Sequence, residues 1–180
     1  PGEPGIWVVI VGDVVVFVIL FGLFLHYQGE QPEQFAASQS RLEPGFGFIN
    51  TVWLLVSSLA VVIGVNAVRL GRTVSADRAF RIAFWFGVAF VVTKGIEWGL
   101  KIDAGYVPHT DDFFMLYYVL AGLHLLHVFV GLLVLSLVRR AARRPLTGVH
   151  DRQMIESGAV FWHMVDLLWL VLFPLLYFVH

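Results

Sequence analysis

The residues of this sequence that could carry chemistry are ionisable side chains set inside long apolar runs. Lys94 and Glu97 lie three apart in "VTKGIEW", and His163 and Asp166 lie three apart in "FWHMVDLLW". Residues at this spacing share a helix face, so each pair can satisfy itself partly within its own helix. Ionisable groups inside a membrane cost roughly 2.5–3.5 kcal/mol each on insertion scales, so they usually face a protein interior and are paired.

Further ionisable residues suggest two kinds of chemistry, metal binding and proton handling. They are Asp13 in "VGDVVVF", His124 and His127 in "GLHLLHV", and Glu156 ahead of the last apolar run. A di-iron helix bundle needs a Glu-x-x-His pair on each of two helices plus two further glutamates, and this sequence contains no Glu-x-x-His. We therefore expect buried, hydrogen-bonded structural groups and no metal ligands. Proton handling by Asp13 or Glu97 stays open, because low-dielectric surroundings favour the protonated form of a carboxylate.

A stripe of small and polar residues recurs every seven positions in "NTVWLLVSSLAVVIG", at Asn50, Ser57 and Gly64. Such residues gain nothing from acyl chains, so this face should meet another helix. Trp162 and Trp169 are also seven apart. We interpret them, with the other aromatic and Met residues, as packing.

Five apolar runs must position these residues, at about 6–27, 48–69, 79–100, 113–138 and 158–179. Each is about 20 residues or longer, enough to cross a hydrocarbon core about 30 Å thick as a helix. The connections between them hold polar and helix-breaking residues, as in "HYQGEQPEQFAASQSRLEPG". Hydrophobic residues make up 58% of the chain and mean hydropathy is +0.79. The sequence predicts an all-α integral membrane five-helix bundle, a single transmembrane domain over residues 1–180.

Charge and cysteine content exclude several functions and orient the helices. A net charge of −1 gives no reason to expect nucleic acid, and the absence of Cys excludes disulfides, thiolate metal sites and thiol nucleophiles. Nine of the twelve basic residues flank the second and fourth connections: Arg69, Arg72, Arg78, Arg81, Arg139, Arg140, Arg143, Arg144 and Arg152. The positive-inside rule therefore places the N-terminus in the cytoplasm and the C-terminus outside. Because the first residue is not Met, we expect the sequence to begin within a longer product.

Five motifs follow one another along the chain. They are "GDVVVF", "NTVWLLVSSLAV", "FVVTKGIEW", "GLHLLHVFVG" and "ESGAVFWHMVDLLWLVLF". In this order they resemble subunit III of the haem–copper cytochrome oxidases, in the branch that also includes a nitric-oxide-reductase-associated protein. The resemblance maps Asp13 onto the family's buried carboxylate, although the respiratory branch usually has Glu there. The best-known members have two further spans that form a lipid cleft, and we do not carry that cleft over.

The resemblance implies a non-catalytic integral subunit of the bacterial cytoplasmic membrane. Haem and copper are expected in the partner, a subunit I-like catalytic protein, and none in this chain. The family's subunit III stabilises that partner, binds phospholipid and supports proton uptake during oxygen reduction. Within the bundle, His163 and Asp166 are expected to lock the last helix to its neighbours, with Glu97 and Glu156 as candidate partners.

Three alternatives to an oxidase subunit stay open. The first is an accessory protein of a nitric oxide reductase. The second, from another class, is a membrane enzyme that binds a metal or haem through Glu97, His124, His127, His163 and Asp166. The third is a transporter or proton channel, although no pair of broken helices meeting at the midplane is apparent in the sequence.

Overall fold

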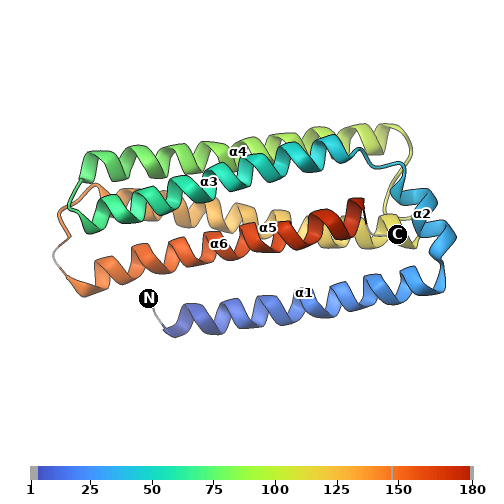
Figure 1. Ribbon diagram of the computed structural model, residues 1–180, viewed down its shortest axis with the longest axis horizontal. Coiled ribbons are helices and arrows are strands. Elements are labelled where there is room, and N and C mark those ends of the chain that lie inside the picture. The colour runs from blue at the N-terminus through green and yellow to red at the C-terminus, as the bar shows by residue number, and fades with distance from the viewer. Residues whose placement is uncertain (1–3, 147, 179–180) are drawn as a thin grey trace.

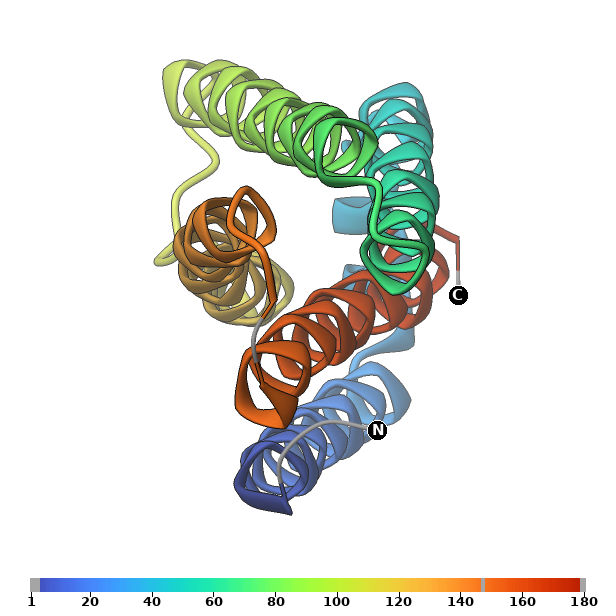
Figure 2. The ribbon, with the colours of Figure 1, turned by 90° about the vertical axis from the view of Figure 1, so that its left-hand side faces the viewer.

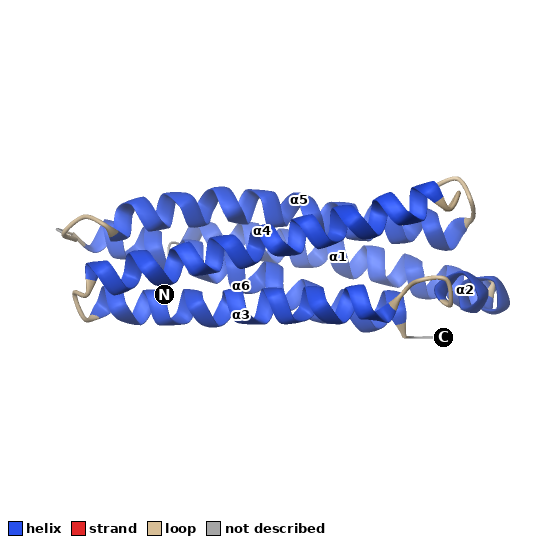
Figure 3. Ribbon diagram, turned by 90° about the horizontal axis from the view of Figure 1, so that it is seen from above, coloured by secondary structure: helices blue, strands red, loops and turns tan. Residues whose placement is uncertain are grey.

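The computed structural model describes residues 4–146 and 148–178, which form helices joined by short loops and contain no strand (Figures 1 and 3). The six helices are α1 (Pro4–Glu30), α2 (Pro32–Gln39), α3 (Pro44–Arg69), α4 (Thr73–Asp103), α5 (Asp112–Ala142) and α6 (Val149–Tyr177). All except α2 are long and apolar enough to cross a membrane. The predicted all-α architecture with five spanning helices is confirmed.

The spanning helices are longer than the apolar runs that predicted them. Helix α4 begins at Thr73 and α6 at Val149, ahead of the predicted starts at 79 and 158. Hydropathy detects only the part of a helix in hydrocarbon, whereas the backbone ladder continues until a residue interrupts it. Gly71 and Gly105 lie directly beyond α3 and α4 with φ of 71° and 89°, a left-handed conformation that suits glycine at a helix end. Position 179 of the last predicted run lies outside the described residues.

The first connection, which holds polar and helix-breaking residues, contains a short helix of its own. Helix α1 continues to Glu30, and α2 follows at once with Pro32 in its first turn. Proline is well suited to this position, because its fixed φ matches the helix and its missing N–H would have no helical partner there. Phe35 of α2 is buried and its ring packs edge-on against Phe24 and Phe113. Burial of this aromatic residue helps to hold a mostly polar segment against the bundle.

Helices α3, α4, α5 and α6 pack in a ring, each against the next, and α1 lies outside this group (Figure 2). Helix α1 touches α5, α6 and α2 through a narrow seam. Ile10, Phe17 and Phe24 form that seam at seven-residue spacing. The rest of α1 exposes valine, isoleucine and leucine side chains. A helix with one seam and an otherwise apolar surface is suited to a peripheral position in a bilayer.

Trp162 of α6 occupies the centre of the ring and touches the other three helices. Its indole Nε1 donates to Ser57 Oγ of α3 at 3.0 Å. A Cβ atom added to Gly87 of α4 would lie 2.8 Å from the indole, and one added to Gly131 of α5 would lie 2.6 Å from it. Glycine is required at both positions because the ring occupies the space of a side chain.

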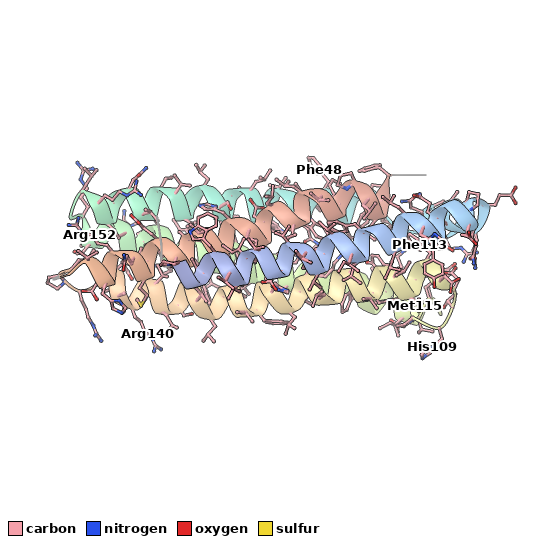
Figure 4. The ribbon with its side chains drawn as sticks, turned by 90° about the horizontal axis from the view of Figure 1, so that it is seen from below. Phe48, His109, Phe113, Met115, Arg140 and Arg152 are labelled. Atoms are coloured by element: carbon pink, nitrogen blue, oxygen red, sulfur yellow. The ribbon has the colours of Figure 1, made fainter. Side chains whose placement is uncertain are left out.

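All the arginines except Arg41 lie at one end of the bundle, where α3 and α5 end and α4 and α6 begin. Arg140 and Arg152 mark this end in Figure 4, and His109, Phe113 and Met115 mark the other. Helix α1 begins at the arginine end (Figure 1). The placement of this end in the cytoplasm remains a prediction from the positive-inside rule.

We predict that Gly131→Ala destabilises the bundle by about 1–3 kcal/mol, the usual cost of overpacking, because the new methyl group collides with Trp162. The control is Gly95→Ala in α4, where an added Cβ meets nothing within 4 Å and helix propensity improves. Unfolding in mixed detergent micelles, followed by circular dichroism, measures both. Equal stability of the two variants would contradict the close approach.

Candidate functional site

The interior of the bundle contains a fully buried ion pair on α4. Lys94 Nζ lies 2.9 Å from Glu97 Oε1, and the side chains are 1% and 0% exposed. The pair is formed within one helix turn, as the three-residue spacing predicts. Two charges removed from water at this depth need further hydrogen bonds to offset their lost hydration.

Two tyrosines from other helices supply those hydrogen bonds. Tyr117 of α5 donates to Glu97 Oε1 at 2.5 Å, and Tyr177 of α6 lies 2.7 Å from both carboxylate oxygens. The carboxylate therefore gathers donors from α4, α5 and α6. The sequence reading assigned aromatic residues to packing and missed these hydroxyl groups. Tyrosine inside an apolar run near a buried carboxylate is the signal that could have identified them, since a buried hydroxyl needs a partner.

The Lys94 ammonium lies among aromatic rings. It is 4.8 Å from the centre of the Trp169 ring and 5.4 and 5.7 Å from those of Tyr117 and Tyr177. It also donates to Tyr177 Oη at 3.3 Å. The negative ring faces attract the cation, so the pair is satisfied on both sides by side chains. The arrangement suits a rigid junction between helices.

His163 and Asp166 meet a serine of α3. His163 Nδ1 lies 3.1 Å from Ser58 Oγ, and the Asp166 carboxyl group lies beside the same serine. Asp166 Oδ1 is buried and has no hydrogen-bond partner among the described residues. The expected partners lie elsewhere: Glu97 binds Lys94, and Glu156 pairs with Arg69 at 3.2 Å. That expectation was wrong because sequence spacing does not show which residue of α3 faces α6. A nucleophilic serine needs a histidine base that a carboxylate orients, whereas here the serine itself lies beside both the histidine and the carboxylate.

A ladder of hydrogen bonds sets the register of α3 against α6. Trp169 Nε1 donates to Thr51 Oγ1 at 3.0 Å, about two helical turns along from the Trp162–Ser57 bond described above. Ser57 in turn donates to the Ala83 carbonyl of α4 at 2.7 Å. The predicted stripe belongs to this face: Asn50, Ser57 and Gly64 are all buried. A Cβ added to Gly64 would lie 2.9 Å from the Phe80 ring, so this face of α3 meets α4 and α6.

Asp13 joins α1 to the ring of four helices. Its Oδ1 lies 3.2 Å from His127 Nε2 of α5, with the two side chains 25% and 14% exposed. The carboxylate is thus half-buried, because α1 is peripheral. His127 Nδ1 lies 2.7 Å from the Leu123 carbonyl oxygen. Because a carbonyl oxygen only accepts hydrogen bonds, Nδ1 must carry a proton. The contact between Nε2 and Oδ1 then needs one shared proton, held either by the imidazole or by the carboxyl group.

The remaining histidine of the motif faces another way. His124 Nε2 lies 2.8 Å from the Val165 carbonyl of α6, and its ring packs against Phe90 and Trp169. Within residues 4–146 and 148–178, no group of three His, Asp or Glu side chains is arranged to hold a metal ion. The residues that the metal-enzyme alternative would use as ligands therefore take part in separate contacts.

Residues 3–180 match the family model described as cytochrome c oxidase subunit III. The chain belongs to this family. It is 30% identical to the cytochrome c oxidase subunit 3 of Thermostichus vulcanus over 176 residues, which cover 96% of this chain and 85% of that protein. It is 28% identical to the cytochrome bo(3) ubiquinol oxidase subunit 3 of Buchnera aphidicola over 177 residues, covering 96% and 84% of the two chains.

Subunit III of this family is part of a haem–copper oxidase, as the motifs of this chain predict. The chain's five long apolar helices agree with a multi-pass membrane protein. The similar proteins include subunits of both cytochrome c and ubiquinol oxidases, so the match identifies the type of subunit and leaves the electron donor undetermined. The motif residues of this subunit III chain form separate junctions: Lys94–Glu97 inside the ring, Ser58–His163–Asp166 between α3 and α6, and Asp13–His127 between α1 and α5.

We predict that Glu97→Leu destabilises the bundle by about 3–5 kcal/mol, because it leaves the Lys94 ammonium buried without its counter-ion. The double variant Lys94→Met/Glu97→Leu should be less destabilised than Glu97→Leu alone, since it leaves only neutral hydroxyl groups unpaired. Denaturation in mixed micelles of both single variants and the double variant measures their coupling energy. Additive effects of the two substitutions would show that the charges do not depend on each other.

Proposed function

We propose that this chain is a non-catalytic subunit III that stabilises the catalytic subunit of a haem–copper oxidase, binds lipid and supports proton uptake during oxygen reduction. The match of residues 3–180 to the subunit III family carries the proposal. The relevant partner is a subunit I-like membrane protein that holds the haem and copper. The location proposed is the bacterial cytoplasmic membrane, with the arginine-rich end of the bundle in the cytoplasm.

The arrangement of the polar residues supports a structural role for this chain. Glu97 and His163 bond to side chains of neighbouring helices, Asp166 lies beside Ser58 of α3, and His124 bonds to a backbone carbonyl. These contacts fix helix positions and use the groups that a metal centre or a nucleophilic site would need. A subunit built in this way presents a rigid surface to a larger partner and contributes stability to the complex.

The pair formed by Asp13 and His127 supports the proton-related part of the proposal. It is half-buried at the edge of the ring, and its geometry needs one proton between Oδ1 and Nε2. A carboxyl–imidazole pair of this kind can accept or release a proton with little movement of atoms. We propose that this contact sustains proton uptake by the partner over many turnovers, with no part in the reaction of oxygen itself.

Co-purification tests the proposed function most directly. A tagged chain extracted from its native membrane in mild detergent should carry with it a catalytic chain whose haem absorbs in the Soret region. The chain isolated from that complex should show neither haem absorption nor stoichiometric iron or copper. Metal or haem bound to the isolated chain would favour the enzyme alternative, and a nitric oxide reductase as the accompanying protein would assign the chain to that complex.

We predict that Asp13→Asn keeps a near-normal initial rate of oxygen consumption in the purified complex. The asparagine amide can donate to His127 Nε2 and so keep the contact without a charge. Asp13→Ala leaves that nitrogen unpaired, so this variant should lose activity faster over many turnovers. Val15→Ala, on the exposed face of α1, is the control. Complete loss of initial activity in a fully assembled Asp13→Asn complex, with all cofactors present, would move this residue into the catalytic mechanism.

A further inference from the structure

The arginine end of the bundle carries more positive charge than its own carboxylates neutralise. The segments 69–81 and 139–156 contain nine arginines against Asp77, Asp151 and Glu156. Asp77 accepts from both Arg139 and Arg143, and Glu156 pairs with Arg69. For Arg144 and Arg152, no carboxylate lies within ion-pair distance in the part of the chain that the structure describes.

Arg144 and Arg152 line one pocket together with Arg69. This pocket, of about 580 Å³, lies where the α3–α4 turn meets the end of α5 and the start of α6. Its other lining residues are Val68, Leu70, Gly71, Thr73, Ala142, Pro145 and Leu146, and none of them is acidic. Leu70 is 68% exposed. The pocket therefore combines guanidinium groups with apolar surface at the level where the spanning helices end.

Two neighbouring pockets differ in the feature that matters for an anion. One contains Arg139, Arg140 and Arg143, but Asp77 already binds two of these arginines. Another contains Arg140 and Arg144 with Asp151 in its wall. A carboxylate in or beside a pocket repels an anionic ligand. In the Arg144–Arg152 pocket, Arg69 has Glu156 as its partner, but Arg144 and Arg152 have no carboxylate partner among the described residues, so these two guanidinium groups are available to a negative charge.

We propose that this pocket binds the headgroup phosphate of an anionic phospholipid, with Arg144 and Arg152 as its ligands. Guanidinium groups bind phosphate oxygens through paired N–H donors, and the exposed Leu70 gives the acyl chains an apolar surface to cover. Basic pockets between spanning helices are a usual setting for anionic lipid headgroups. The apolar part of the lining favours a lipid over a free phosphate ion. The inference rests on the lipid-binding part of the proposed function and gives it a location.

Retention of lipid by the purified complex tests the site. The complex is reconstituted into vesicles of phosphatidylglycerol and phosphatidylcholine in equal amounts, extracted, and its bound lipids are counted by native mass spectrometry. Arg144→Gln/Arg152→Gln should retain phosphatidylglycerol at least about tenfold more weakly, since each arginine contributes on the order of fivefold. The matched control Arg78→Gln/Arg81→Gln removes two arginines of α4 that do not line this pocket and should retain the lipid as the unaltered protein does.

Two further measurements keep the proposal falsifiable if the glutamine variant does not assemble. The unaltered complex should retain phosphatidylglycerol in preference to phosphatidylcholine, and inorganic phosphate at constant ionic strength should not displace it. Equal retention by both double variants, no preference between the lipids, or displacement by phosphate would overturn the lipid assignment. Co-purification of the catalytic chain reports on the proposed function separately: an intact complex without lipid preference would overturn this site alone.

Discussion

The relative positions of α4, α5 and α6 depend on how the bundle accommodates one buried carboxylate. Glu97 is fully buried, and its charge is tolerated only because Lys94, Tyr117 and Tyr177 donate to it from three helices. Moving any of these helices would break a charge-assisted hydrogen bond inside hydrocarbon, where no water replaces it. The interaction therefore adds little net stability, but only one packing arrangement of the helices satisfies it. Selecting one arrangement in this way is the best-supported role of buried ion pairs.

Close contact between helices makes that arrangement attainable. Trp162 fits between Gly87 and Gly131 while its N–H binds Ser57, so the largest side chain of α6 lies against the smallest residues of α4 and α5. In a bilayer, helix association relies on such packing and on interhelical hydrogen bonds, since burial of apolar surface is no longer favoured over lipid contact. Serine and threonine hydroxyls of α3 then bind the polar atoms of α6, and each one aligns the two helices along their length.

Helices α1 and α2 lie outside the ring and attach to it at only a few points. Helix α1 is held by its phenylalanine seam and by Asp13 on His127. Helix α2 closes the opposite end: Ser38 binds Asp111 at the start of α5, and Gln39 donates to the carbonyls of Leu175 and Leu176 in the last turn of α6. The last carbonyls of a helix lack donors within that helix, so α2 caps α6 as well as covering the bundle. The exposed surface of α1 and the arginine end are left available to lipid and partner.

The sequence by itself determined the five spanning helices, the end of the bundle that carries the arginines, and the intrahelical Lys94–Glu97 pair. Each of these depends on composition or on spacing within one segment, and a helix has a fixed period from which such features can be read. Only the tertiary structure decided that Ser58, and neither Glu97 nor Glu156, meets His163 and Asp166, that two tyrosines complete the site of Glu97, and that Asp13 is half-buried against His127. It also decided that part of the first connection is helical, because Phe35 finds its apolar contacts on α1 and α5. Contacts between helices depend on the rotation and register of each one, and these are set jointly by the side chains of several helices that no single segment contains.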